Sequence, residues 1–199
     1  MERDHVLAMA DLKLSPVLHT PRLVLRPFTP DDAPAVQAYA SDFEVASTTL
    51  SMPHPYPEDG GAAWIASHGA SRAAGTLPLA IARRGDGAVL GAIELRLAAE
   101  HRRAELGYTL ARWEWGKGYA TEAARALVRY GFTELGLHRV HADHMARNPA
   151  SGAVLRKLGM RHEGTQRRHV LRWGAWEDIE RYGMLREEWD EAEASLQAA

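Results

Sequence analysis

The chain has 199 residues, of which 46% are hydrophobic, and this is enough for one domain with a well-packed core. Its formal net charge of −2 lacks the strong basic excess of a dedicated nucleic-acid or anionic-membrane binder. The absence of cysteine excludes disulfides, thiolate metal sites and an acyl-cysteine intermediate. Acids near the amino terminus do not fit a signal peptide, and no apolar run approaches the roughly 20 residues of a membrane span, so we expect a cytoplasmic protein.

The amino-terminal part of the chain predicts one strand followed by helices. Residues 1–19 have no hydrophobic period and are expected to form a lead-in. Alternating apolar residues predict a strand in 20–28. The segment Thr29-Pro30-Asp31-Asp32 is typical of a helix start, with proline at the first helical position and acids in the first turn. Prolines at every second position exclude regular structure in 51–57, and 60–72 predicts another helix.

The rest of the chain predicts six more strands and a crossover helix. Gly85-Asp86-Gly87 is a strong hairpin signal between the first two of three antiparallel strands. The predicted elements are strands at 77–84, 88–97 and 105–112, a helix at 120–132, a strand at 138–143, a helix at 148–158, strands at 161–171 and 175–184, and a short helix with a frayed tail in 185–199. Together with the first strand they predict an α+β fold, in which helices flank a mixed sheet.

One glycine-rich segment lies between a predicted strand and the start of the crossover helix. It reads Trp115-Gly116-Lys117-Gly118-Tyr119-Ala120-Thr121. Glycine lets backbone N–H groups approach a ligand closely, and a helix start adds unsatisfied N–H groups and the positive end of the macrodipole. The segment therefore predicts a phosphate-binding loop. It matches neither G-x-x-x-x-G-K-[ST] nor G-x-G-x-x-G, the two common glycine-rich phosphate loops.

The spacing resembles the pyrophosphate loop [Q/R]-x-x-G-x-[G/A] of the GNAT superfamily of acetyl-CoA-dependent N-acetyltransferases. Trp115, Gly118 and Ala120 stand at its first, fourth and sixth positions. Tryptophan at the first position is common in the RimJ/RimL branch, the ribosomal-protein N-acetyltransferases and their small-amine relatives. The chain is similar to this branch from about Thr20 to Trp189. The similarity is carried, in the expected order, by Thr20-Pro21-Arg22-Leu23-Val24-Leu25-Arg26-Pro27, Glu105-Leu106-Gly107-Tyr108, Trp115-Gly116-Lys117-Gly118-Tyr119-Ala120-Thr121-Glu122-Ala123, Asn148-Pro149-Ala150-Ser151 and Leu158-Gly159-Met160-Arg161-His162-Glu163-Gly164.

The resemblance implies a single GNAT domain at 20–189, between the lead-in and a tail at 190–199. It also implies the GNAT fold, a mixed and mostly antiparallel sheet of seven strands, flanked by helices, with a splayed central strand pair. Dimers are common in this branch, so a homodimer is possible. The implied activity is direct transfer of an acetyl group from acetyl-CoA to a primary amine, which is either a protein amino terminus or a small molecule.

The resemblance also implies how acetyl-CoA is held. Backbone amides of 116–120 would bind the pyrophosphate, while Lys117 either adds charge there or is solvated. A backbone N–H in 107–110 would polarise the thioester carbonyl, and Gly107 either permits a bulge or serves packing. Asn148 would contact the pantetheine arm or cap its helix. The full set expected to bind the co-substrate is Tyr108, Leu110, Trp115, Gly116, Lys117, Gly118, Tyr119, Ala120, Thr121, Asn148 and Ser151.

The transfer also needs a proton acceptor for the amine and a proton donor for the departing thiolate. Glu105 resembles the family glutamate that accepts the amine proton. Its alternative is a surface glutamate paired with an arginine such as Arg102 or Arg103. His169 is the second candidate base, because it titrates in the useful range, and bulk water is the third. Many relatives donate the proton for the thiolate from a tyrosine, at the position where this chain has Leu155. The RimJ/RimL branch instead has a serine for this role, at the position of Ser151.

Two further expectations concern the surroundings of these residues. His138, His141 and His144 do not predict a metal site, because strand geometry places His141 on the face opposite the other two and no H-E-x-x-H occurs. The acceptor pocket is expected between the first helical region, with the rigid segment 51–57, and the last hairpin, whose turn Trp173 and Trp176 flank. The alternative to an enzyme is a non-catalytic coenzyme A or acetyl-CoA sensor of the same fold.

Overall fold

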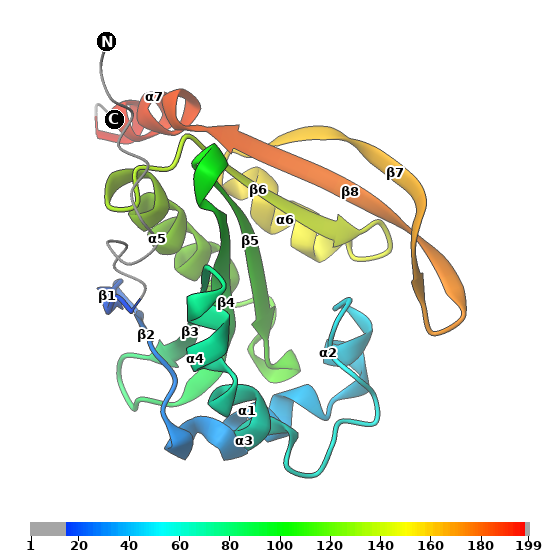
Figure 1. The fold of residues 1–199 in the computed structure, drawn as a ribbon. Helices are drawn as coiled ribbons and strands as arrows, with labels where there is room; N and C mark the ends of the chain where they lie inside the picture. Colours follow the sequence, from blue (N-terminus) through cyan, green and yellow to red (C-terminus); the bar gives the residue numbers. More distant parts are fainter. Residues whose placement is uncertain (1–14, 198–199) are drawn as a thin grey trace.

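The computed structural model describes residues 15–197 and contains one sheet of eight strands in the order β1-β2-β3-β4-β5-β6-β8-β7 (Figure 1). The strands are β1 Leu18–His19, β2 Leu23–Arg26, β3 Thr76–Arg83, β4 Val89–Ala98, β5 Arg103–Leu110, β6 Arg139–Met145, β7 Arg161–Arg172 and β8 Ala175–Leu185. The α-helices are α1 Ala33–Ala40, α2 Phe43–Ser47, α3 Gly60–Ala66, α4 His68–Ala73, α5 Tyr119–Thr133, α6 Pro149–Lys157 and α7 Arg186–Gln197. Three 3-10 turns are Pro30–Asp32, Ala99–His101 and Arg112–Glu114.

The mixed, mostly antiparallel sheet confirms the predicted GNAT fold, but the number of strands was wrong. The additional strand is β1, which lies in the predicted lead-in and pairs with β2 at Leu18–Leu25 and His19–Val24. Helix α2 was not predicted, and the single helix expected at 60–72 is two helices that meet at Ser67. Helix α7 extends to Gln197, well past the predicted start of the tail. Residues 1–14 of the expected lead-in lie outside the described residues.

Helices cover the sheet unequally, and two separate apolar cores result (Figure 1). The larger core joins α5 and α6 to the sheet, with fully buried side chains such as Leu95, Leu127 and Phe132. A smaller cluster joins α1, α2 and α3 around Val36, Tyr39 and their neighbours. None of the helices in 15–197 combines the length and the apolar character that crossing a membrane requires.

Strands β5 and β6 are parallel neighbours only at their first residues. The paired residues are Arg103 with Arg139, Ala104 with Val140, and Glu105 with His141. Beyond Glu105, β5 stays paired with β4 as far as Leu110, while β6 stays paired with β8, so the two strands diverge (Figure 1). This divergence confirms the predicted splayed pair and opens a gap in the middle of the sheet.

Gly107 lies at this gap, but it does not form a bulge. The β4–β5 register is continuous from Gly91–Leu110 to Ala98–Arg103. A Cβ atom on Gly107 would lie 3.3 Å from Glu94 Oε1 and 3.4 Å from Arg96 Nη2. Gly107 is therefore a packing residue that leaves room for an ion pair on the neighbouring strand.

The segment before β2 is tied to the first turn of α5 through Glu122. The Thr20 hydroxyl and the Arg22 backbone N–H donate to Glu122 Oε1 at 2.6 and 2.9 Å, and Arg22 Nε donates to Oε2 at 2.6 Å. Arg22 Nη1 also donates to the Lys117 carbonyl at 3.0 Å, so the same arginine holds the glycine-rich loop. Burial by itself would raise the pKa of Glu122. These hydrogen bonds and the charge of Arg22 together outweigh burial, so the pKa lies below its usual value of 4.5.

We expect Glu122→Gln to reduce the free energy of unfolding at pH 7 by about 1–2 kcal/mol, because hydrogen bonds to a charged, mostly buried carboxylate are lost, although their partner Arg22 is half-exposed. A lowered carboxyl pKa in the folded state gives stability that is present above the unfolded pKa and lost as pH falls through the folded pKa. The difference between wild type and variant should therefore shrink below about pH 4. Urea unfolding across pH tests this, and Glu134→Gln, at an exposed site at the end of α5, is the control. An equal effect in both variants would contradict the role of Glu122.

Candidate functional site

The glycine-rich loop presents backbone N–H groups at the start of α5. Gly116 and Gly118 have φ angles of 75° and 81°, which strongly favour glycine, and Gly118 is the N-cap of the helix. The Glu122 N–H bonds to the Gly118 carbonyl at 3.1 Å. The amides of 119–121 belong to the first turn, where a helix has no acceptor of its own for them. These amides and the helix dipole make the loop suited to an anionic group.

Side chains of the loop are engaged elsewhere. Trp115 Nε1 donates to the Leu110 carbonyl at 2.9 Å and so fixes the loop to the end of β5. Lys117 Nζ lies 3.0 Å from Glu114 Oε2, and Arg83 Nη2 lies 2.9 Å from Oε1 of the same buried carboxylate. Lys117 is therefore ion-paired with Glu114 rather than simply solvated. The loop offers an anion mainly its backbone.

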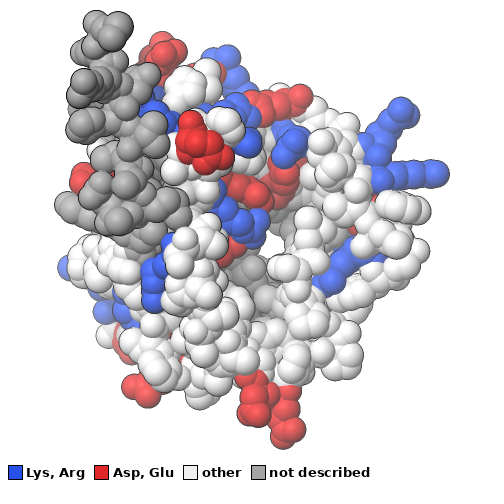
Figure 2. Space-filling view, in the orientation of Figure 1, with Lys and Arg blue, Asp and Glu red and all other residues white. Residues whose placement is uncertain are grey.

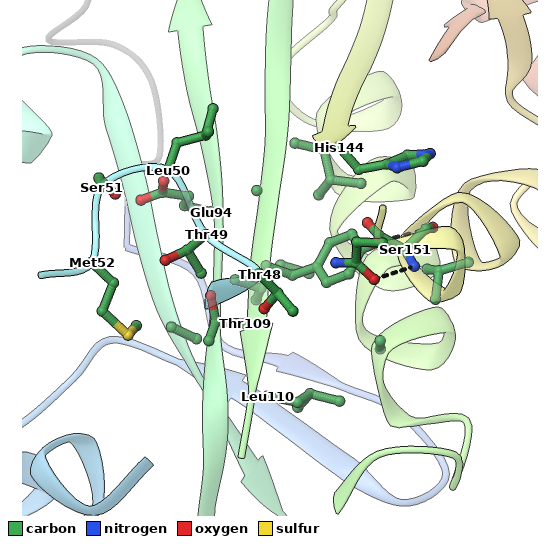
Figure 3. Close-up of a pocket in the computed structure, with 18 of the residues that line it drawn as sticks. Thr48, Thr49, Leu50, Ser51, Met52, Glu94, Thr109, Leu110, His144 and Ser151 are labelled. Carbon is green, nitrogen blue, oxygen red and sulfur yellow. Dashed lines mark hydrogen bonds between the residues drawn. The ribbon is translucent and has the colours of Figure 1, made fainter. Parts of the chain in front are cut away.

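A cavity of about 1020 Å³ passes through the sheet at the gap between β5 and β6. Its lining includes Glu105, Gly107 and Thr109 as well as Leu106, Tyr108 and Leu110. Because alternate residues of a strand face opposite sides of a sheet, these two sets show that the cavity is open on both faces. The glycine-rich loop and α6 border it on one face. The loop after α2 borders it on the other, as the positions of Ser151 and of Thr48 to Met52 show in Figure 3.

On the α5–α6 face, two hydroxyl groups meet. Tyr108 Oη lies 2.8 Å from Ser151 Oγ and donates to the Ser151 carbonyl at 3.1 Å. Burial raises the pKa of Tyr108 to about 12, although the hydrogen bond with Ser151 lowers it somewhat. Asn148 is the N-cap of α6 and accepts from the Ser151 N–H at 3.3 Å. Leu155, which stands where many relatives have a tyrosine, is buried in the core.

On the opposite face, charged side chains line the cavity beside the gap, namely Glu94, Arg96 and Glu105 together with Asp143 of β6. Arg96 Nη1 donates to Glu105 Oε1 at 2.8 Å, and Arg96 Nε and Nη2 donate to Glu94 Oε1 at 2.9 and 2.6 Å. Glu105 is thus paired with an arginine, but this is Arg96 and neither of the predicted residues. Arg102, for example, donates to the Gly136 carbonyl at 2.8 Å. Glu94 was missed by sequence reasoning, and only the hairpin register, which places it opposite Gly107, could have indicated it.

The last hairpin forms the far wall of this face of the cavity. Its register shifts between Gln166 and Val170, and His169, an exposed residue in this irregularity, lines the cavity together with Val170. Arg172 donates to the Met52 carbonyl and so ties the hairpin to the loop after α2. The tryptophans at the turn do not line the cavity as expected. Trp173 stacks on Phe43 with ring centroids 5.4 Å apart, and Trp176 is exposed.

The histidines near β6 have separate environments. His138 precedes the strand, His141 is a neighbour of Glu105 in the sheet, and His144 is buried with Nδ1 2.9 Å from the Met145 carbonyl. His144 also stacks on Tyr182 with ring centroids 5.6 Å apart. Among residues 15–197, no three His, Cys, Asp or Glu side chains are grouped so that they could hold a metal ion.

Comparison with known proteins agrees with this geometry. The family model of the acetyltransferase (GNAT) domain matches residues 22–161. The N-acetyltransferase YoaA of Bacillus subtilis, itself uncharacterized, is 32% identical over 187 residues, which cover 86% of this chain and 97% of that protein. The ribosomal protein uS5-alanine N-acetyltransferase of Escherichia coli is 37% identical over 73 residues, 37% of this chain and 38% of that protein.

The fold is also found in solved structures. A GNAT-family acetyltransferase from Bacillus anthracis is 28% identical and superposes with a TM-score of 0.77, covering 86% of this chain and 99% of that one. The match of the family model over most of the chain, the similarity to YoaA over nearly its whole length and the shared fold lead to one assignment. The chain belongs to the GNAT acetyltransferase family and is an N-acetyltransferase.

Proposed function

We propose that this enzyme moves the acetyl group of acetyl-CoA directly to a primary amine, within a ternary complex of enzyme, acetyl-CoA and acceptor. The observation that carries the proposal is the single cavity that opens on both faces of the sheet. It has an anion-binding loop on one side and carboxylates on the other. Two substrates can therefore meet in the gap from opposite directions. Absence of cysteine also removes the usual thiol route through an acyl-enzyme.

Backbone groups hold the co-substrate in this proposal. The amides of 116–120 bind the pyrophosphate, and Tyr108, Leu110, Asn148 and Ser151 border the path from this loop to the gap. Both glycines fit such a ligand, because their φ angles are positive and the space beside the missing Cβ of Gly116 is open. A backbone N–H of β5 in 107–110, a stretch not paired with β6, polarises the reacting carbonyl. Bound acetyl-CoA supplies the activated acetyl group.

In this proposal, side chains around the gap accept the proton of the amine and donate a proton to the thiolate. Glu105 accepts the proton of the amine, and Arg96 orients its carboxylate through the 2.8 Å hydrogen bond. His169 lies on the hairpin wall of the same cavity and is the second candidate for this role, with water as the third. Ser151, hydrogen-bonded to Tyr108, gives a proton to the departing thiolate. The hydroxyl pair compensates for Leu155, which stands at the position of the usual tyrosine.

The alternative is a protein that binds coenzyme A or acetyl-CoA without turnover, which Leu155 and the arginine-paired Glu105 keep open. A panel of amines and amino-terminal peptides, assayed for release of coenzyme A from acetyl-CoA, separates the two functions. Peptides from ribosomal proteins belong in this panel, because one relative acts on ribosomal protein uS5. Turnover of any acceptor excludes a pure sensor.

We expect acetyl-CoA to raise the melting temperature of the protein. Binding to the folded state alone adds about 2.7 kcal/mol at a hundredfold excess over Kd. Differential scanning fluorimetry with and without millimolar acetyl-CoA, and with coenzyme A alone, measures this. If neither ligand shifts the melting temperature, the proposed binding site is wrong.

Gly118→Val is expected to abolish this ligand-induced shift. A valine at a φ angle of 81° is strained by about 1–2 kcal/mol, so the variant should also melt somewhat lower on its own. Its Cβ would lie 3.4 Å from Arg22 Nη2, and its methyl groups would take up space in the loop that we propose for the pyrophosphate. Gly85→Val is the matched control, because a side chain at Gly85, in the turn between β3 and β4, meets open space. Normal coenzyme A binding by Gly118→Val would show that the loop is not the phosphate site.

Glu105→Gln should lower kcat by about 10²–10⁴-fold near neutral pH, with a much smaller change in the KM for acetyl-CoA. The loss should shrink as pH rises, because more of the acceptor is then already a neutral amine. Comparison of the pH–rate profiles of wild type, Glu105→Gln and His169→Ala identifies the base. If Glu105→Gln retains the acidic limb of the wild-type pH–rate profile at the full wild-type rate, Glu105 is not the base. Loss of that limb in His169→Ala transfers the role to His169, and no change in either indicates water.

A further inference from the structure

The half of the cavity on the side of α1–α3 has apolar walls and a charged floor. We call this half the acceptor chamber. Its walls include Tyr39, Met52, Tyr56 and Trp64, all of which belong to or pack against the second apolar cluster. Its floor is the group Glu94, Arg96 and Glu105 on β4 and β5. Walls of this kind bind an apolar group by removing its surface from water, at about 25 cal/mol per Å².

These three side chains carry one unit of negative charge, because two carboxylates surround one guanidinium; Asp143 of β6 also lines the cavity, and its charge is paired with that of Arg181. The hydrogen bonds to Arg96 use only Oε1 of Glu94 and only Oε1 of Glu105. A carboxylate has two acceptor oxygens, so Oε2 of each remains to accept from a ligand. The floor therefore has the charge and the acceptor atoms to bind one ammonium group.

Glu94 has the better position for this contact. Glu105 is the last β5 residue that pairs with β6, so the gap begins just after it. Glu94 is the cross-strand partner of Gly107, the next β5 residue on the same face, and therefore lies further along the gap than Glu105. Because Gly107 has no side chain, the Glu94 carboxylate extends over β5 to within 3.3 Å of the place that a Cβ would take. Figure 3 shows Glu94 close to Thr49 and Leu50, which line the same cavity.

The outer wall of the chamber is basic. Arg167 and Arg168 immediately precede His169, which lines the cavity, and both are exposed. Figure 2 shows basic side chains that project from the β7 side of this face, while acidic and basic side chains gather around the central hollow. Positive charge at the entrance opposes the approach of a polycation more strongly than that of a molecule with a single charge, because the repulsion grows with the charge of the ligand.

From these observations we infer that the acceptor is a monoamine with an apolar, aromatic-sized body, and that Glu94 selects it by binding its ammonium group. The inference rests on the proposed function and narrows its acceptor. The apolar body lies among Tyr39, Met52, Tyr56 and Trp64. Glu94 is then a residue that binds the acceptor, while Glu105 takes the proton. Polyamines, with several charges and no apolar body, do not fit this chamber.

The experiment measures binding without turnover. Isothermal titration calorimetry of the full chain, with and without saturating coenzyme A, compares 2-phenylethylamine with three probes. These are 2-phenylethanol, which lacks the charge, ethylamine, which lacks the ring, and spermidine, which is a polycation. We expect 2-phenylethylamine to bind about tenfold or more tightly than each. Equal or tighter binding of the alcohol, ethylamine or spermidine overturns the inferred acceptor class in the unmodified protein.

Variants then test Glu94 itself. Glu94→Gln should weaken 2-phenylethylamine about tenfold and leave 2-phenylethanol unchanged, while Glu94→Asp should retain part of the preference. Glu100→Gln, at an exposed carboxylate in the turn Ala99–His101, should bind as wild type. Unchanged amine binding by Glu94→Gln, or an equal loss for the alcohol, overturns the role of Glu94.

Kinetics separate this role from catalysis and from the proposed function. With acetyl-CoA and 2-phenylethylamine, Glu94→Gln should raise the KM of the amine about tenfold with little change in kcat, whereas Glu105→Gln should lower kcat. A fall in kcat for Glu94→Gln with no change in KM contradicts selective binding by Glu94. Selective amine binding without any turnover of the amine panel would overturn the transferase proposal and leave the chamber assignment standing. Turnover only of acceptors without an apolar body would support the transferase proposal and overturn the chamber assignment.

Discussion

The divergence of β5 from β6 after Glu105 is the constraint on which the site depends. Each strand is held on its outer side, β5 by β4 and β6 by β8, so both remain straight and regular while their inner edges separate. The backbone groups on those inner edges no longer bond to each other and must be satisfied by water or by a ligand. A substrate that enters the gap therefore finds ready hydrogen-bond donors and acceptors. Residues from both faces of β5 line the cavity along this gap.

The two faces at this gap differ because one carries apolar residues and the other carries charges. Leu106, Tyr108 and Leu110 face the large core, whereas the alternate residues of the same strand face an ionic layer. That layer continues on β6 and β8, where Arg181 Nη2 lies 3.1 Å from Asp143 Oδ2. Exposed ion pairs add little to stability. Burial of these charges under a helix would be costly, and no helix within residues 15–197 packs tightly on this part of the sheet. The face remains open, as the proposed approach of the acceptor requires.

Much of the fold and the place of the glycine-rich loop before α5 could be predicted from the sequence because they depend on local patterns. Glycines at 116 and 118, the helical stripe of α5 and the Gly85–Gly87 turn each determine structure within a few residues. The strand β1 was missed because two residues carry no period, and the break at Ser67 left the apolar pattern of α3 and α4 intact. The partner of Lys117 was missed because it is set by tertiary packing, which no local pattern specifies.

The acceptor side was harder to predict for the same physical reason. Glu94 belongs to the site only through the register that places it opposite Gly107, and Ser151 meets Tyr108 only because α6 packs beside β5. Neither contact has a signature within one segment. The last hairpin was expected to line the acceptor pocket, but Trp173, which flanks its turn, packs on Phe43 and remains exposed. Sequence reasoning thus found the residue types of the site but not all of its partners.

The charge of the chamber connects acceptor choice with the proton transfer. In the proposed roles, one ammonium group neutralises the single negative charge of Glu94, Arg96 and Glu105. Transfer of its proton to Glu105 moves charge within the chamber but leaves the total at zero. The amine becomes nucleophilic without a net charge having to enter or leave the cavity during the reaction, which avoids a large desolvation cost. After the neutral amide departs, Glu105 returns its proton to water, and the restored negative charge attracts the next ammonium group. A second positive charge on the acceptor would have no counter-charge in this group, and the further carboxylate that lines the cavity, Asp143, is already paired with Arg181.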